Sequence, residues 1–148
     1  MNLLIKAAVA ASALYLMSPS ANASMDTFGV HVGSVHSNKN SNWNNSNPGV
    51  YAVWGVHDLS TFADGNYVAG TYYNSIRKQS FYVGRLFEWG NVGLIAGVVT
   101  GYSRPALPMV VPTVRLDLTP HWKARITVVP KVDKNGAAAV HFSFEYKF

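Results

Sequence analysis

The last ten residues of the chain alternate between two kinds of side chain. One face is apolar or aromatic and comprises Val140, Phe142, Phe144, Tyr146 and Phe148. The other face is small or polar and comprises Ala139, His141, Ser143, Glu145 and Lys147. Successive side chains of a β-strand point to opposite faces, so the pattern predicts a strand with one wholly apolar face. Such a strand would invite aggregation at a free edge, which favours a sheet closed on itself.

Alternation of this kind recurs along the chain, between clusters of Gly, Asn, Pro and Asp. We expect eight strands, at 28–36, 49–57, 66–74, 80–89, 92–102, 108–118, 122–130 and 139–148. Short connections such as 118–121 contrast with the long polar connection 37–48. An even strand number, unequal connections and aromatic residues near strand ends are typical of bacterial outer-membrane barrels. The sequence therefore predicts an all-β, eight-stranded antiparallel transmembrane β-barrel of the outer membrane.

The N-terminus reads as a secretory signal peptide. Lys6 supplies a positive charge, residues 7–17 form a short apolar run, and Ala21-Asn22-Ala23 matches a small-x-small cleavage signal. The alternative is a membrane anchor, but the run is shorter than the roughly 20 residues that a spanning helix needs. We therefore expect residues 1–23 to be removed and residues 24–148 to form the barrel.

The amino-acid composition limits which ligands and partners the protein could bind. The chain has no cysteine, which excludes disulfides, thiolate metal sites and a cysteine nucleophile. Its charged fraction of 13% lies below the quarter or so usual for soluble domains. The net charge of +5 suits an anionic partner without choosing between nucleic acid and lipid. In a membrane barrel we expect lipid, no nucleic acid, no metal, no cofactor and a monomeric state.

The predicted lumen divides into a polar and an apolar half. If both termini lie in the periplasm, the inward residues near that end are Glu88, Arg115, Asp117, Lys123, Arg125, Glu145, Lys147 and His57. We expect them to form a salt-bridged plug. The outer half carries apolar residues and glycines, including Gly70, Gly84 and Gly97. An eight-stranded barrel holds side chains or one small ligand. The glycines therefore indicate either a slot for an acyl chain or simple relief of crowding.

Prolines fall in or beside strands, where a missing N–H interrupts the ladder. Pro48 precedes the second strand, Pro112 lies in the sixth and Pro130 ends the seventh. Gaps are therefore expected between strands one and two and between strands six and seven, and a lipid tail could enter sideways there. Ordinary punctuation of strand ends would explain Pro48, and it explains Pro112 and Pro130 less well.

Two long stretches resemble a known family. They are GNYVAGTYYNSIRKQSFYVGRLFEWG and VGLIAGVVTGY…LPMVVPTVRL…ITVVPKVDKNGAAAVHFSFEYKF. Together with the proline pattern, they are similar to the PagP-type lipid A palmitoyltransferases, eight-stranded outer-membrane enzymes. The resemblance implies transfer of an acyl chain from a phospholipid donor to lipid A or a related lipopolysaccharide acceptor. It also implies that Pro108, Pro112 and Pro130 border the family's lateral lipid gates, and the gap expected at Pro48 would be a further one.

The resemblance also implies a set of catalytic residues. It matches His31 to the family's histidine and Asn74-Ser75 to its Asp-Ser pair. Asn74 is the main departure, because an amide cannot carry the charge with which a carboxylate stabilises a cationic histidine. His36 could supply a substitute base. Arg77 and the adjacent Lys78 could hold acceptor phosphate by charge, or they could bind lipopolysaccharide without specificity.

The residues expected to line an acyl-chain pocket are Gly70, Tyr72, Gly84, Leu86, Gly97 and Val111. Leu86 stands where the family has the glycine that sets the pocket depth, so we expect a donor chain shorter than palmitoyl. Only residues 24–27 precede the expected first strand, which leaves no room for the family's amphipathic N-terminal helix.

Two other functions remain open at this point. A non-catalytic outer-membrane barrel (an adhesin, an exclusion factor or a membrane-stabilising protein) would use the Asn-rich connection 37–48 as its binding surface. A soluble exported lipid-binding β protein would bury the apolar faces inward instead. In either membrane reading, the C-terminal Phe148 resembles the signal by which the barrel-assembly machinery recognises its clients.

Overall fold

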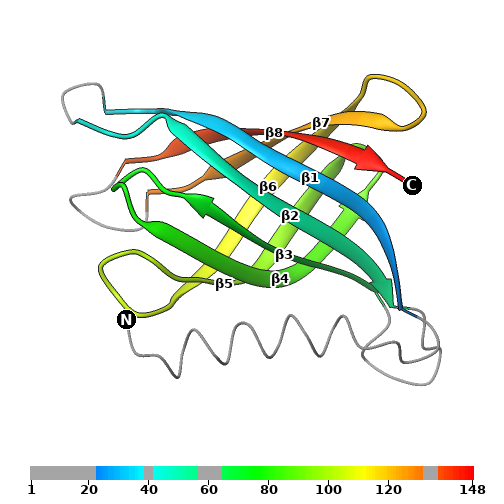
Figure 1. The fold of residues 1–148 in the computed structure, drawn as a ribbon, viewed down its shortest axis with the longest axis horizontal. Helices are drawn as coiled ribbons and strands as arrows, with labels where there is room; N and C mark the ends of the chain where they lie inside the picture. Colours follow the sequence, from blue (N-terminus) through cyan, green and yellow to red (C-terminus); the bar gives the residue numbers. More distant parts are fainter. Residues whose placement is uncertain (1–22, 39–41, 57–64, 132–136) are drawn as a thin grey trace.

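The computed structural model of the chain describes residues 23–38, 42–56, 65–131 and 137–148. It contains the strands β1 (Ala23–His36), β2 (Ser46–Val56), β3 (Gly65–Tyr73), β4 (Gln79–Trp89), β5 (Val92–Val99), β6 (Leu107–Asp117), β7 (Trp122–Val129) and β8 (Ala139–Lys147). Each pairs antiparallel with the next, and β1 pairs with β8, so that the sheet closes into a barrel (Figure 1). The expected all-β, eight-stranded antiparallel barrel is confirmed. No helix in the described ranges is long and apolar enough to cross a membrane.

The first strand begins earlier than the sequence pattern predicts. β1 starts at Ala23 rather than residue 28, so the residues expected to precede the barrel belong to its wall. The reason is a register shift between Met25 and Thr27, which breaks the alternation that the sequence pattern relies on. The expected cleavage after Ala23 concerns a segment that lies mostly outside the described residues.

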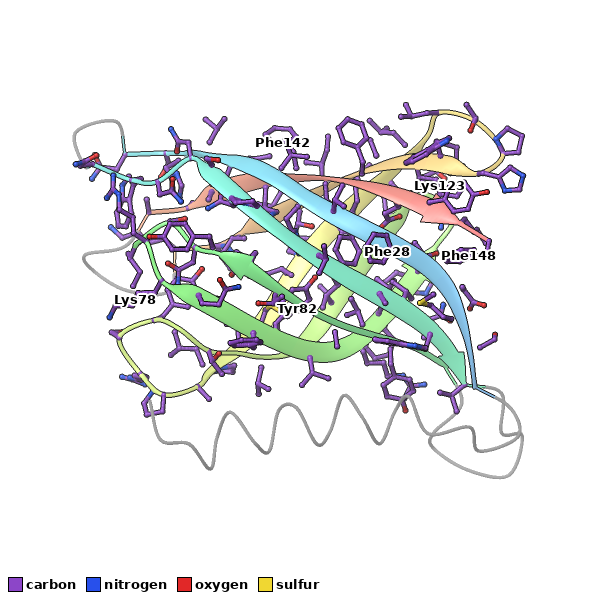
Figure 2. The ribbon with its side chains drawn as sticks, viewed as in Figure 1. Phe28, Lys78, Tyr82, Lys123, Phe142 and Phe148 are labelled. Carbon is purple, nitrogen blue, oxygen red and sulfur yellow. The ribbon has the colours of Figure 1, made fainter. Side chains whose placement is uncertain are left out.

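The two ends of the barrel differ in their connections. The turns that follow β1, β3 and β5 lie at one end, which we call the loop rim, and the C-terminus lies at the other (Figure 1). Lys78 and Lys123 mark these opposite ends (Figure 2). This arrangement follows from an even number of antiparallel strands that start and finish at the same end.

Apolar side chains cover the outer wall. Exposed members of this surface are Phe28, Val30, Val50, Val110, Val114, Leu116, Trp122, Phe142 and Phe144. They come from β1, β2, β6, β7 and β8, and Phe142 projects away from the sheet in Figure 2. Phe148 is 65% exposed, and its backbone N–H donates to the carbonyl of Asp26 at 3.1 Å. The faces with alternating Val, Leu and Phe therefore point out of the barrel.

Ion pairs fill the interior near the C-terminal end. Arg125 pairs with both Glu88 and Glu145, and Arg115 links Glu88 to Asp117. Lys123 also contacts Asp117. These are the residues expected in a polar plug, apart from Lys147, whose side chain is exposed beside a small polar cavity, and His57, which lies outside the described residues.

An apolar cluster lies above this network in the barrel interior. Its buried members are Tyr51, Val53, Val68, Tyr82, Leu86, Ile95, Val99 and Val111. The Tyr51 hydroxyl donates to Glu145 Oε1 at 2.7 Å and so joins the cluster to the ion pairs below. The lumen is therefore divided into a polar and an apolar half, as the sequence pattern indicates.

Candidate functional site

A tight turn at residues 74–78 connects β3 to β4 at the loop rim. The fully buried side chain of Asn74 holds this turn together: its Oδ1 accepts from the backbone N–H of Ile76 at 3.0 Å and of Lys78 at 2.9 Å. Its Nδ2 donates to Ser80 Oγ and to the Gly101 carbonyl, both at 2.9 Å. An asparagine that bonds its own turn in this way is a common turn device. Asn74 therefore fixes the position of the adjacent Ser75.

Ser75 faces a histidine at the end of β1. His36 Nε2 lies 2.6 Å from Ser75 Oγ, and His36 Nδ1 lies 2.7 Å from Asn45 Oδ1. Because an amide oxygen only accepts, Nδ1 carries the proton toward Asn45, and in the neutral imidazole Nε2 then accepts from the serine hydroxyl. His36 is 9% exposed, whereas Ser75 is half-buried and Asn45 is exposed. The result is a Ser–His–Asn relay that opens to the loop rim.

The segment that carries Asn45 is fastened to the turn that carries Ser75. Asn44 donates its backbone N–H to the Ser75 carbonyl at 2.9 Å and its amide to the Asn74 carbonyl at 3.1 Å. The Arg77 guanidinium donates back to the carbonyl and the side chain of Asn42, both at 2.9 Å. These bonds hold the three members of the relay in one geometry, although they come from separate stretches of the chain.

An aromatic ring covers the histidine of the relay. Trp43 stacks on His36 with ring centroids 5.4 Å apart and an interplanar angle of 17°. Its indole N–H is buried and, among the described residues, has no hydrogen-bond acceptor. The ring limits the space on one face of His36 and so helps to fix the imidazole plane.

His31 lies deeper in the lumen. Its Nε2 is 3.0 Å from the Tyr82 hydroxyl, its Nδ1 is 2.9 Å from His141 Nε2, and its ring packs against Tyr51 and Tyr72. The resemblance implies that His31 acts with Ser75, whereas in the structure Ser75 contacts His36, the residue expected only as an auxiliary base.

A β-bulge explains why His36 can reach Ser75. The register of β1 shifts between His31 and Gly33 against both of its neighbours. An extra residue in one strand reverses which side chains point inward beyond it. Ser34 and His36 consequently become buried, although their positions alternate out of phase with His31.

Side chains occupy the space expected for an acyl chain. A Cβ at Gly70 would lie 2.5 Å from Tyr51 Cβ and 2.8 Å from Tyr82 Cε1. Gly84 and Gly97 are direct partners across β4 and β5, and a Cβ at Gly84 would lie 2.6 Å from the Ala96 carbonyl oxygen. A side chain at any of the three glycines would therefore clash, which agrees with the relief of crowding that the sequence left open, and the acyl slot stays a prediction.

Three other residues expected in the acyl pocket contribute to the same packing. Leu86 and Val111 are buried members of the apolar cluster, and Tyr72 bonds the Tyr102 hydroxyl at 2.9 Å. Burial raises the pKa of the Tyr102 phenol above its ordinary value, so this pair stays neutral. A chain could enter this part of the lumen only by displacing aromatic rings.

The ladder between β6 and β7 is incomplete. Pairing runs from Asp117–Lys123 to Thr113–Thr127 and stops there, although β6 continues to Leu107 and β7 to Val129. Pro112 is the first unpaired position of β6 on this side, and Pro130 follows the end of β7. The gap lies where the proline pattern predicts one, next to the loop rim.

The ladder between β1 and β2 is interrupted only briefly. Pairing passes from His31–Gly49 to Gly33–Ser46, so that Pro48 falls in the register shift and has no partner in β1. The expected passage of lipid at either place stays a prediction.

The chain was compared with protein-family models, curated proteins and solved structures, and none of them matches it. In the described parts of the chain, no three histidine, cysteine or acidic residues gather in a group that could hold a metal ion. The feature that points to a function is therefore the geometry of the loop rim. Asn45 and Trp43 were missed by sequence reasoning, because one asparagine among several between residues 38 and 47 carries no distinguishing spacing.

Proposed function

We propose that the protein is an outer-membrane acyltransferase that moves a fatty acyl chain from a phospholipid to lipid A or a related outer-leaflet acceptor. The observation that carries the proposal is the 2.6 Å contact between Ser75 Oγ and His36 Nε2. A hydroxyl bonded to an imidazole that a third group orients is the arrangement by which serine becomes reactive toward acyl esters. Ser75, His36 and Asn45 are the proposed reacting and orienting groups, and Asn74 holds the turn.

The outer wall supports a location in the outer membrane. The sheet closes into a barrel whose β6–β7 ladder is open next to the loop rim, and exposed Val, Leu and Phe side chains surround it. A barrel of this kind is one of the two backbone arrangements that satisfy peptide groups in hydrocarbon. The loop rim would then face the outer leaflet, where the acceptor lies, as a consequence of export and assembly through the terminal Phe148.

The packing of the lumen affects how the acyl chain of the donor could enter. Tyr51 and Tyr82 fill the upper lumen, so the acyl chain would either displace them or lie in the unpaired opening between β6 and β7. Leu86, which the resemblance places at the floor of the pocket, is buried below them, and we expect a donor chain shorter than palmitoyl. Lys78, exposed on the turn after Ser75, could contact an acceptor phosphate.

Lipid A mass spectrometry tests the proposal. Cells that carry the intact protein in a perturbed outer membrane should gain one acyl chain on lipid A. Ser75→Ala and His36→Ala should lower this product about 10²-fold or more, the range in which a general base contributes. The exposed Ser103, on the same rim, provides the matched control Ser103→Ala, which should keep full activity.

Two outcomes would change the conclusion. If His31→Ala lost the acylated product while His36→Ala kept it, His31 would be the base. Unchanged lipid A in cells with fully assembled intact protein would favour the second candidate, a non-catalytic barrel. The filled lumen is the observation that favours this candidate, because side chains occupy the space an acyl chain would need.

A further inference from the structure

One charged side chain lies on the outward face of β3, β4 and β5, as far as the structure describes these strands. It belongs to Arg85 in β4. Tyr82 and Leu86 of the same strand belong to the apolar cluster of the lumen, so Arg85, which is out of phase with both, points outward. The other outward positions of the three strands carry glycine, aliphatic, aromatic or uncharged polar residues. A charge on a wall that faces lipid is costly unless it reaches polar groups, so its position there indicates a binding site.

The side chain of Arg85 runs toward the end of the barrel that carries the C-terminus. In the sheet, Arg85 lies opposite Tyr67 of β3 and Ala96 of β5. Its guanidinium nevertheless lies beside Gly65, the first residue of β3, where a Cβ would be 2.6 Å from Arg85 Nη2. The side chain therefore extends past Tyr67 and away from the middle of the wall. Long basic side chains on lipid-facing surfaces extend in this way toward the polar edge of a membrane.

Two aromatic rings flank the guanidinium. Arg85 Cζ lies 5.2 Å from the ring centroid of Phe87 and 5.9 Å from that of Tyr67. Phe87 stacks in turn on Trp89, the last residue of β4, with ring centroids 6.4 Å apart. Aromatic rings attract a cation placed near them, and they also restrict where it can move. The rings therefore hold the guanidinium on the wall at one height.

Exposed aromatic residues mark the same height on other strands. Trp89 ends β4, Trp122 begins β7 and Phe148 follows β8, and each of the three is more than half exposed. The rings of Trp122 and Phe148 both contact Tyr146. Belts of aromatic residues on barrels coincide with the lipid headgroups. In the membrane location proposed above, Arg85 would therefore reach the headgroup layer at the C-terminal end.

We propose that Arg85, held by Phe87 and Tyr67, binds the phosphate group of a phospholipid in the leaflet at the C-terminal end. The inference rests on the proposed membrane location and is independent of acyl transfer at the loop rim. A guanidinium can donate two parallel N–H bonds to phosphate oxygens, whereas an ammonium offers only a point charge. The acyl chains of the bound lipid would lie on the exposed Val92 and Val98 of the neighbouring β5.

Native mass spectrometry tests the site. Full-length folded protein in detergent micelles is titrated with dioleoylphosphatidylglycerol, and retained lipid adducts are counted. Arg85→Gln should weaken binding of one lipid about 10-fold or more, the contribution of hydrogen bonds to a charged group. Arg85→Lys should lie between Arg85→Gln and the unaltered protein. Lys147→Gln removes an exposed positive charge at the same end and should bind as the unaltered protein does.

A second comparison uses the unaltered protein alone, so it does not depend on how the variants fold. Dioleoylglycerol, which has the same acyl chains without phosphate, should not be retained. Inorganic phosphate at millimolar concentration should not displace phosphatidylglycerol, because the acyl chains contribute to binding. Retention of dioleoylglycerol, or displacement by inorganic phosphate, would overturn the proposed lipid site. Heat-modifiable gel migration confirms that each variant is folded before it is compared.

The remaining outcomes separate this inference from the proposed acyl transfer. One phosphatidylglycerol retained through Arg85, in a protein that leaves lipid A unchanged, would support the inference and defeat the transfer. Acylated lipid A with equal lipid retention by Arg85→Gln and the unaltered protein would overturn the inference and leave the transfer. If Arg85→Gln lowered the midpoint of unfolding without changing lipid retention, the guanidinium would serve the chain itself, and the inference would also be wrong.

Discussion

At the scale of single residues, the most instructive position is Asn74. Resemblance to the family places it at a catalytic aspartate, but in the structure all of its polar atoms bond the turn and its neighbours. Two of those bonds use the amide N–H groups as donors, toward Ser80 and the Gly101 carbonyl, and a carboxylate has none to offer. The surroundings of residue 74 therefore suit asparagine and not aspartate. The third member of the relay is Asn45 instead.

Asn74→Asp should destabilise the protein even though it restores the residue of the family. A carboxylate would face the Gly101 carbonyl oxygen and lose both donated bonds, which costs about 1–3 kcal/mol for unsatisfied buried groups. The midpoint of urea unfolding in micelles should fall accordingly. Asn91→Asp, at an exposed turn position, is the matched control and should leave the midpoint unchanged. Equal midpoints for both variants would show that the turn accommodates a carboxylate.

At the scale of strands, sequence reasoning succeeded wherever alternation was uninterrupted. Eight strands and their outward faces follow directly from period-two patterns such as that of β8. The predicted strand boundaries were wrong where the strands are irregular. The register shift after Met25 hid the start of β1. Gly101, with a positive φ of 89°, lies where the extended conformation stops, so β5 ends earlier than predicted. The same limitation hid the pairing of His36 with Ser75, because a bulge that reverses parity leaves no mark in the sequence.

The incomplete ladder between β6 and β7 can be probed with disulfides, since the chain has no cysteine of its own. Thr113 and Thr127 are the last direct partners, and cysteines there should cross-link on oxidation because opposite Cα atoms lie about 5 Å apart. Cysteines at Val111 and Val129 would face each other only if pairing continued. We expect that pair to stay reduced, as read by non-reducing gel electrophoresis. Equal cross-linking of both pairs would contradict an opening there.

At the scale of the whole molecule, the barrel is organised around a buried charge network below an apolar cluster. Glu145 is 1% exposed and accepts from both Tyr51 and Arg125. Buried ion pairs add little over apolar packing, but removing one partner leaves the other charge uncompensated. The network closes the end of the lumen opposite the relay, which makes a continuous channel incompatible with the packing of the described residues.

Glu145→Gln should lower the free energy of unfolding by about 3–5 kcal/mol, because Arg125 would keep only Glu88 as a countercharge. Urea titration in micelles, followed by heat-modifiable migration, measures the loss. Lys147→Gln removes an exposed charge from the same strand and should change the free energy by less than about 0.5 kcal/mol. A similar effect of both substitutions would mean that solvent reaches the network and screens it.

The hydrogen bonds that join the connections at the loop rim have a consequence for the chain before it has folded. His36 closes β1 and Ser75 follows β3, and Asn44 and Arg77 bind the two connections together where these residues meet. A chain still in transit, with its strands unpaired, has a serine but no base beside it. Under the proposed function the reactive pair is therefore created by folding, and a precursor on its way to the outer membrane would not attack the lipids that it meets.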